Sequence, residues 1–400
     1  MKIGAEFGLT PETTIRDSLY DLVPLSAEAS KLLATPAMLR LDGIQQLGFV
    51  SRIWPAARHS RLEHSIGVMH LMREALIQLR SRGVPIDDEG ARTGIAAALL
   101  HDVGHYPFSH AIEELGDPVQ PHEQVGRHLI EGHEVSRILI DDWHVDPGRV
   151  ADLIDPRESG IAPADRVARQ LLSGPLDVDK LDYLPRDARA CSVPYGGVDT
   201  ARLLAALADI DTPSGRVLGI DHKGISPMHS LMNARQEMFD NVYWHHTNRA
   251  CMAMLLRAVQ DALDAGLPPS ELTEYADVAL LDRLSQTDMP DSTRRLVRDS
   301  RTDKCTNALS RSLAWRPICM RISVGLFANP ARRRDLEHRL VETIAGLAAE
   351  NIEPADILID IPKPEKWRSN VWVQFDDSAG RSEPNNVLGG QSPASMIRLY

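Results

Sequence analysis

Four candidate metal ligands, spread along otherwise helical sequence, constrain this chain more than any other feature. His64 lies in RHSRLEHSIGV, the pair His101-Asp102 ends AALLHD, and Asp179 lies in DVDKLDY. A histidine followed directly by an aspartate can direct an imidazole nitrogen and a carboxylate oxygen toward the same ion. Two further nitrogen or oxygen ligands complete a set suited to a divalent cation. Chance explains an isolated His-Asp pair better than it explains four such residues in these contexts. The sequence therefore predicts a fold that gathers these four side chains around one ion.

Helical periodicity dominates the first three quarters of the chain. Apolar residues recur at helical spacing through SRLEHSIGVMHLMREALIQL, which stops before the GVP turn. Asp87 or Asp88 can cap a second helix that ends at Gly104. Turn residues between two short apolar runs predict a hairpin within 210–226. Further helices are expected at 123–141, 164–172, 176–190, 199–209 and 227–265.

The pattern changes near residue 315. Segments 319–327, 356–362 and 370–376 have the composition of strands, and 331–351 is a long amphipathic helix. This order predicts a small α+β region, ending in a loop over 377–400. We therefore expect a mainly α fold with a helical domain at 1–270, a helical connector at 271–317 and a C-terminal α+β region at 318–400.

Composition narrows the class of protein. The net charge of -12 gives no general attraction to nucleic acid or anionic lipid, so nucleic-acid binding is not expected as a primary role. The four cysteines form no CxxC pair, which excludes a thiolate zinc site. No signal-like N-terminus and no long apolar run occurs, so we expect a cytoplasmic protein without a membrane partner.

The candidate ligands predict hydrolytic phosphate chemistry. Two imidazoles and two carboxylates suit one Mn, Mg, Fe, Zn or Co ion per subunit, and the sequence does not choose among these metals. Three more histidines follow closely, at His105 and His110 in HDVGHYPFSH and at His122 in PHEQVG. Each alone is more often a surface or capping residue. Together they offer a general acid and hydrogen-bond donors for a phosphate.

The segment 176–190 predicts a second wall of the same pocket. Asp179, Tyr183 and Arg186 share one helical face, with Asp187 one residue further on and Lys180 beside them. The alternative is a solvated helix face, on which Asp182 and Arg186 form an ordinary i,i+4 pair. A phenol and several charges next to a predicted ligand favour the pocket.

At this point the motifs are recognisable as a family pattern. The chain resembles the HD-domain deoxynucleoside triphosphate (dNTP) triphosphohydrolases, which include bacterial dGTPase-like enzymes and the sterile-alpha-motif-and-HD-type dNTP hydrolases. The matching strings include RHSRLEHSIGV, HDVGHYPFSH, DVDKLDYLPRD and RQEMFDNVYWHH. The resemblance implies an HD-domain helical core, a homo-oligomer (dimer or tetramer), and cleavage of dNTPs, dGTP among them, to deoxynucleoside and inorganic triphosphate.

The resemblance also implies roles for matching positions, which fall into four groups. His64, His101, Asp102 and Asp179 would hold the metal, and His110 and His122 would serve the attack and the leaving oxygen, with Glu113 or Glu123 as the orienting carboxylate. The triphosphate would contact Arg61, His105, Lys180, Tyr183 and Arg235. The deoxyribose would contact Gln46, Leu47, Asp187 and Tyr243, with Leu47 and Tyr243 against its 2' edge.

Two alternatives stay open at this point. The metal centre could act on another nucleotide, such as a monophosphate, a cyclic dinucleotide or a guanosine alarmone, or the fold could serve a non-catalytic nucleotide sensor. Relatives also bind an allosteric nucleotide at subunit interfaces. The basic segment 293–304 is a candidate for that role here, and an exposed charged helix is the alternative.

Overall fold

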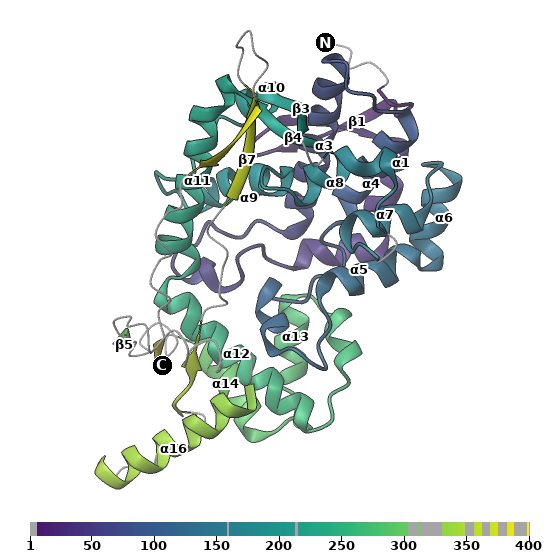
Figure 1. Ribbon diagram of the computed structural model, residues 1–400. Coiled ribbons are helices and arrows are strands. Elements are labelled where there is room, and N and C mark those ends of the chain that lie inside the picture. Colours follow the sequence, from purple (N-terminus) through teal and green to yellow (C-terminus); the bar gives the residue numbers. More distant parts are fainter. Residues whose placement is uncertain are drawn as a thin grey trace.

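The computed structural model shows a mainly helical protein, which confirms the expected fold class (Figure 1). It describes residues 6–157, 160–212, 215–302, 311–312, 330–348, 356–361, 369–374, 382–387 and 398–399. The first half of the chain contains the helices α1 (Ala27–Leu33), α2 (Pro36–Arg40), α3 (Arg61–Ser81), α4 (Asp88–Leu100), α5 (His122–Glu131), α6 (His133–Asp141), α7 (Pro147–Ile154), α8 (Arg166–Ser173) and α9 (Val178–Ala190). Short 3-10 segments include η1 (Leu41–Gly43), η2 (Gly48–Arg52), η3 (Ser109–Leu115) and η4 (Pro163–Asp165).

The second half continues with helices of unequal length. They are α10 (Thr200–Ala206), η5 (His222–Gly224), α11 (Ile225–Met238), α12 (His246–Asp264), η7 (Pro269–Thr273), α13 (Asp277–Leu284), α14 (Asp291–Ser300) and α16 (Pro330–Ala348). The helix expected at 227–265 is interrupted by η6 (Phe239–Tyr243), a π-helical turn. The helix expected at 123–141 is broken at Gly132, whose extended backbone ends α5 and begins α6.

Strands occur where the sequence predicted them and also where it did not. The hairpin β3 (Leu207–Thr212) and β4 (Gly215–Asp221) is confirmed, although β3 takes over the end of the helix expected at 199–209. The pair β1 (Pro11–Asp17) and β2 (Asp21–Ser26) was not expected. The remaining strands are β5 (Arg311–Ser312), β6 (Ile359–Asp360), β7 (Ser369–Gln374), β8 (Ser382–Val387) and β9 (Arg398–Leu399).

The C-terminal strands are divided between two sheets, one of which, of order β5-β9-β6, contains only strands that follow residue 310. β7 pairs in parallel with β4, giving a sheet of order β3-β4-β7-β8. The loop expected over 377–400 is wrong in part, because β8 pairs with the preceding strand β7 and β9 pairs with the more distant β5 and β6. The strand expected at 319–327 lies outside the described residues. The division into 1–270, 271–317 and 318–400 remains a prediction.

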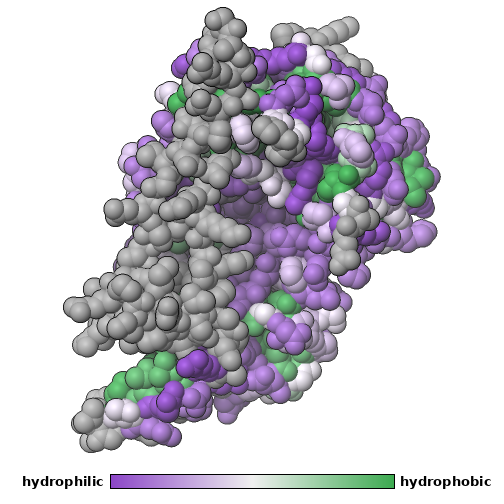
Figure 2. All heavy atoms as spheres, viewed as in Figure 1, coloured by the Kyte–Doolittle hydropathy of each residue, from purple (hydrophilic) through white to green (hydrophobic). Residues whose placement is uncertain are grey.

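Two apolar cores meet near the candidate site. The larger core packs α3 and α4 with α8, α9 and β2. The smaller core packs α12, α13 and α14 with η3, and includes Phe49 and Phe108. Figure 1 shows α3, α4 and α9 in the upper part and α12, α13 and α14 in the lower part. Among the coloured residues of the face drawn in Figure 2, hydrophilic ones predominate, and the surface is hollowed between these parts.

Candidate metal centre and active site

Three helices deliver the predicted metal ligands. α3 begins with a capping box in which Ser60 and Glu63 satisfy each other's backbone N–H groups, and this fixes the turn that carries His64. α4 is capped by Asp87 and its buried apolar residues lead directly to His101. α9 is capped by Asp177, two residues before Asp179. Each ligand therefore lies at or near a helix end that its own sequence defines.

His64, His101 and Asp179 form a compact group. Their ligand atoms all lie within 4.8 Å of one another. His64 Nε2 lies 2.9 Å from Asp179 Oδ1, and His101 Nε2 lies 3.8 Å from the same oxygen. His101 Nε2 is buried and makes no hydrogen bond with any described residue. This donor set fits a divalent cation.

The far nitrogen of each ring is held by an acceptor. His101 Nδ1 donates to the carbonyl oxygen of Ala98 at 2.8 Å, so its Nε2 lone pair faces the group. His64 Nδ1 donates to Asp182 Oδ2 at 2.7 Å. Burial disfavours the charged ring, but hydrogen bonds to Asp179 and Asp182 prevail and raise the pKa of His64 to about 10. A cation between His64 and Asp179 would replace that proton.

Asp182 is the centre of a buried network behind the ligands. Its carboxylate accepts from His64 Nδ1, from Arg186 Nε and Nη2 at 2.8 Å each, and from Tyr20 Oη at 2.8 Å. Arg186 also donates to Asp17 at 2.8 Å. The i,i+4 pair considered from the sequence thus exists, but it is fully buried and orients a candidate ligand. Arg186 consequently faces this network and not the pocket.

Gly67 leaves room for this network. A Cβ atom at position 67 would lie 2.0 Å from Asp182 Oδ1 and 2.4 Å from Arg186 Nη2. Real Cβ atoms do not approach that closely, so any larger residue would displace the pair. The glycine of the string HSIGV is therefore a packing requirement of the metal centre.

Asp102 lies beside the group but faces other partners. Its Oδ2 pairs with the buried guanidinium of Arg61, and its Oδ1 lies 3.1 Å from His105 Nε2 and 3.3 Å from His101 Nε2. Burial would raise the pKa of Asp102, but Arg61 and the two histidines hold it well below the usual range. Arg61, expected at the triphosphate, is here engaged with Asp102 and with Ser109 at 2.9 Å.

Four side chains of the HDVGHYPFSH and PHEQVG segments form a second cluster. Ligand atoms of His105, His110, Glu113 and His122 lie within 4.8 Å of one another. His105 stacks on His122 at 3.8 Å between ring centroids. His122 Nδ1 lies 2.8 Å from Glu113 Oε1 but 3.4 Å from Glu123 Oε2. The geometry thus favours Glu113 over Glu123 as the orienting carboxylate.

The charges in this cluster are set by Glu113. Burial works against ionisation, but hydrogen bonds with His110 and His122 lower the pKa of Glu113 strongly. The same contact outweighs burial at His122 and raises its pKa. His105 is buried beside Arg61 and its pKa is lowered well below the usual value. The arrangement favours the protonated form of His122 and the neutral form of His105, and it leaves His110 with a side chain that is 66% exposed.

The residues expected at the triphosphate lie around the same centre, but most are already engaged. Lys180 pairs with Asp177. Tyr183 stands 6.5 Å from both the His64 and the Tyr243 rings, and the nearby charge of Arg235 opposes the burial that raises the tyrosine's pKa. A bound polyphosphate would therefore compete with these contacts.

The residues expected at the sugar include one preformed contact. Tyr243 Oη donates to Asp187 Oδ2 at 2.7 Å, and His59 Nε2 lies 2.8 Å from Asp187 Oδ1. The side-chain oxygen of Gln46 is buried and has no hydrogen-bond partner among the described residues. Leu47 packs half-buried against the larger core. Sequence reasoning missed His59, although it belongs to the RHSRLEH string.

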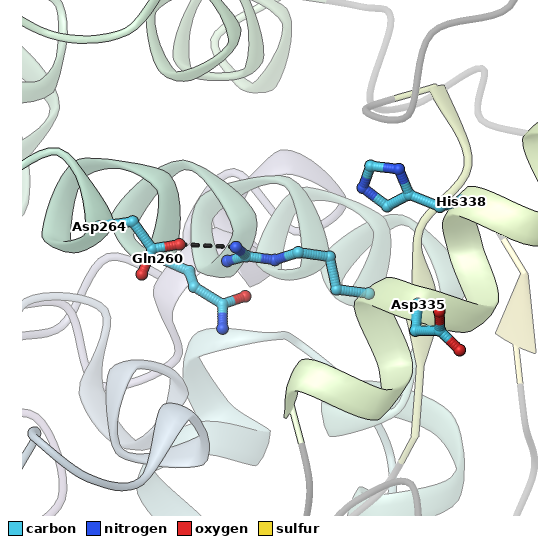
Figure 3. Close-up of a pocket in the computed structure, with 5 residues that line it drawn as sticks. Gln260, Asp264, Asp335 and His338 are labelled. Atoms are coloured by element: carbon cyan, nitrogen blue, oxygen red, sulfur yellow. Dashed lines mark hydrogen bonds and ion pairs between the residues drawn. The ribbon is translucent and has the colours of Figure 1, made fainter.

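A separate cavity of about 470 Å³ lies between α12 and α16 (Figure 3). Gln260 and Asp264 of α12 face Asp335 and His338 of α16, and Arg334 donates to Asp264 at 2.6 Å. None of the candidate metal or catalytic residues lines it. The site described above therefore rests on its side-chain constellation and not on this cavity.

Comparison with known protein families gives two matches that together span most of the chain. The HD domain matches residues 61–184, and the HD associated region matches residues 198–381. The metal candidates all fall within the first of these segments. The chain therefore contains a segment similar to the HD domain, followed by a segment similar to the HD associated region.

Particular relatives extend the likeness over most of the chain. The uncharacterized protein MJ1154 of Methanocaldococcus jannaschii is 28% identical over 96% of this chain and 77% of its own length. The deoxynucleoside triphosphate triphosphohydrolase SAMHD1 homolog of Dictyostelium discoideum is 26% identical over 72% of this chain and 58% of its own length. A solved phosphohydrolase from Bacteroides thetaiotaomicron shares the fold, with a TM-score of 0.71, 24% identity, and coverage of 97% of this chain and 100% of that one.

No described helix is both long and apolar enough to cross a lipid bilayer.

Proposed function

We propose that this protein is a metal-dependent dNTP triphosphohydrolase that releases a deoxynucleoside and inorganic triphosphate. The observation that carries the proposal is the pairing of Tyr243 with Asp187 at 2.7 Å in the same site as the metal group. A metal group alone suits many phosphoesters. A rigid carboxylate–phenol pair beside it suits a substrate whose sugar lacks a bulky polar group at one edge. The resemblance to a SAMHD1 homolog supports this choice.

One divalent cation, held by His64, His101, Asp179 and a turned Asp102, would supply a Lewis acid that activates water and neutralises phosphate charge. The protein's own residues prepare that position. Asp182 and the Ala98 carbonyl orient the two imidazoles, so little reorganisation is needed on binding. Arg61 holds Asp102 in a buried ion pair close by.

In the proposed reaction, the second cluster of His105, His110, Glu113 and His122 would provide general acid–base catalysis. Glu113 raises the pKa of His122, which favours the protonated ring that would donate to the 5' oxygen as it leaves the α-phosphorus. His110, exposed and 3.8 Å from Glu113, can orient the attacking water. Neutral His105 can donate one hydrogen bond to a phosphate oxygen. Arg235, Lys180 and Tyr183 would bind the β- and γ-phosphates.

In this proposal the residues of the sugar pocket would give a preference for deoxyribose over ribose. Gln46 and Asp187 can bind the 3' hydroxyl, because Gln46 has a free buried acceptor and Asp187 keeps lone pairs beyond those used by His59 and Tyr243. Tyr243 and Leu47 would lie against the 2' edge. A ribose hydroxyl there would lose its water without gaining a partner, which costs about 1–3 kcal/mol.

The test is product analysis with metal-loaded protein and each of the four dNTPs and NTPs. We expect deoxynucleoside and intact triphosphate by phosphorus NMR, with dNTPs turned over much faster than NTPs. His101→Ala serves as the inactive control. Pyrophosphate plus monophosphate would refute the substrate pose, and equal rates on GTP and dGTP would refute the sugar argument. Turnover of a cyclic dinucleotide or an alarmone in preference to dNTPs would establish a different HD-type hydrolase.

A further inference from the structure

Asp277, at the start of α13, is a buried carboxylate whose partners are two backbone amides. The residue is 3% exposed. Its Oδ2 accepts from Gln45 N at 3.0 Å, and its Oδ1 accepts from Phe108 N at 2.7 Å. It forms no ion pair with any described residue. Burial raises the pKa of Asp277 to about 6. Burying a carboxylate without an ion-pair partner costs free energy, which suggests that Asp277 has a specific structural role.

The two amides belong to separate segments of the site. Gln45 directly precedes Gln46 and Leu47, the candidate sugar contacts, and Phe108 lies between His105 and His110. Asp277 therefore bridges the sugar side and the catalytic side of the pocket with one carboxylate. Its own segment, 271–317, contains none of the residues predicted to contact substrate.

The Phe108 segment needs such an anchor. Phe108 and Ser109 have φ angles of 59° and 63°, in the left-handed region that non-glycine residues avoid. Two such residues in succession persist only when their surroundings fix them. The Phe108 ring stacks on Phe49 at 4.5 Å, and the Phe108 amide is fixed by Asp277. Without the carboxylate, the Phe108 amide would lose its partner and the turn would lose one of its restraints.

The anchored turn connects to the metal centre. Ser109 Oγ lies 3.0 Å from the carbonyl oxygen of Gln45 and accepts from Arg61 Nε at 2.9 Å. Arg61 in turn pairs with Asp102. A shift of the Gln45 segment or of the turn would therefore reach a candidate metal ligand through two contacts.

Arg40 reinforces the same junction. Its guanidinium donates to the carbonyl oxygens of Val103, His105 and Tyr275 at 2.9, 2.8 and 3.1 Å. Arg40 thus ties the HDVGH loop to the residues just before α13. The start of α13 thus contacts both pocket segments through Asp277, and Arg40 links the residues before α13 to the HDVGH loop.

We propose that Asp277 is a positioning residue that holds the Gln45–Leu47 segment and the Phe108–Ser109 turn in one arrangement, so that sugar recognition and catalysis are set together. The part concerning sugar recognition rests on the proposed function. Asp277 is not among the residues predicted to contact substrate, and in this proposal it acts only through these two segments.

The test compares Asp277→Asn with Asp282→Asn, an exposed position on the same helix that pairs with Arg301. Hydrogen-exchange mass spectrometry should show faster exchange in peptides covering both 41–48 and 104–110 in Asp277→Asn only. One amide hydrogen of the new side chain would face a backbone N–H, so both contacts cannot be kept. We also expect the ratio of kcat/KM for a dNTP over its NTP to fall by about tenfold, with metal content retained.

Asp277→Glu keeps the carboxylate and should lie closer to wild type in both measurements, which also covers the case in which the amide variant folds poorly. Unchanged exchange in either peptide would overturn the proposal. Faster exchange with unchanged sugar selectivity would show that Asp277 has only a structural role, and this result would also overturn the proposal. If the wild-type protein hydrolyses no nucleotide, the proposed function fails, and the exchange of the two peptides alone decides whether Asp277 holds them together.

Discussion

Replacing Asp182 by asparagine should weaken both the fold and the metal centre. Asp182 is fully buried and accepts hydrogen bonds from His64, Arg186 and Tyr20. Loss of its charge leaves Arg186 with Asp17 as its remaining anion, and breaking a buried pair in this way costs about 3–5 kcal/mol.

The pKa of Asp182 gives a second, independent magnitude. Burial would raise this pKa, but hydrogen bonds from Arg186 and His64 lower it to about 2. A depression of the pKa from its ordinary value of 3.8 corresponds to roughly 2–3 kcal/mol of native-state stabilisation. Because the folded pKa is lowered, this contribution is complete at neutral pH and is lost as the pH falls below 3.8 toward 2. Both arguments predict a loss of several kcal/mol at pH 7.

Metal affinity should fall as well, because an asparagine oxygen is a weaker acceptor for the His64 N–H. Loss of such a supporting contact costs about 10–100-fold in affinity. The two effects are measured by urea unfolding of metal-free protein and by chelator competition for a divalent metal. Asp335→Asn is the matched control, since Asp335 and Arg339 form the same i,i+4 pair with side chains 66% and 63% exposed.

The control should lose no more than about 0.5 kcal/mol and keep its metal affinity. Equal losses of stability in Asp182→Asn and Asp335→Asn would refute the argument that the buried network stabilises the fold. Unchanged metal affinity in Asp182→Asn would refute its role behind His64.

Three further changes probe other parts of the site. Gly67→Ala should reduce stability and metal affinity together, since the new Cβ overlaps the Asp182 carboxylate; an unaltered melting temperature and metal content would contradict this. Tyr243→Ala should narrow the preference for dNTPs over NTPs, measured as a ratio of kcat/KM, and an unchanged ratio would remove the residue from the sugar pocket. Glu113→Gln removes the charge that raises the pKa of His122, so the alkaline limb of the pH–rate profile should move to lower pH. A limb that stays in place would show that His122 is not the proton donor.

Sequence alone predicted most of the helices and three of the four candidate metal ligands that lie together, whereas the fourth, Asp102, is paired with Arg61. Helical periodicity and caps such as Ser60 and Asp87 are local, because the hydrogen bonds of a helix lie within one segment. The His64, His101 and Asp179 positions were found because each stands in a distinctive string at a helix end. The structure brings these three together, as predicted.

Only the tertiary structure decided what surrounds those ligands. The strand β9 was missed because its partners β5 and β6 lie far away in the chain. The strand β8 pairs with the neighbouring β7, but its polar sequence SEPNNV lacks the apolar pattern of a strand. Asp182 looked like half of an ordinary surface pair, and burial against Tyr20 and Asp17 made it the support of His64. The sequence around Asp277 does not indicate its role, because the two backbone amides that it binds lie more than a hundred residues away in the chain. The ability of a side chain to bind a metal follows from its residue type, whereas burial and long-range hydrogen bonding arise only when the chain is folded.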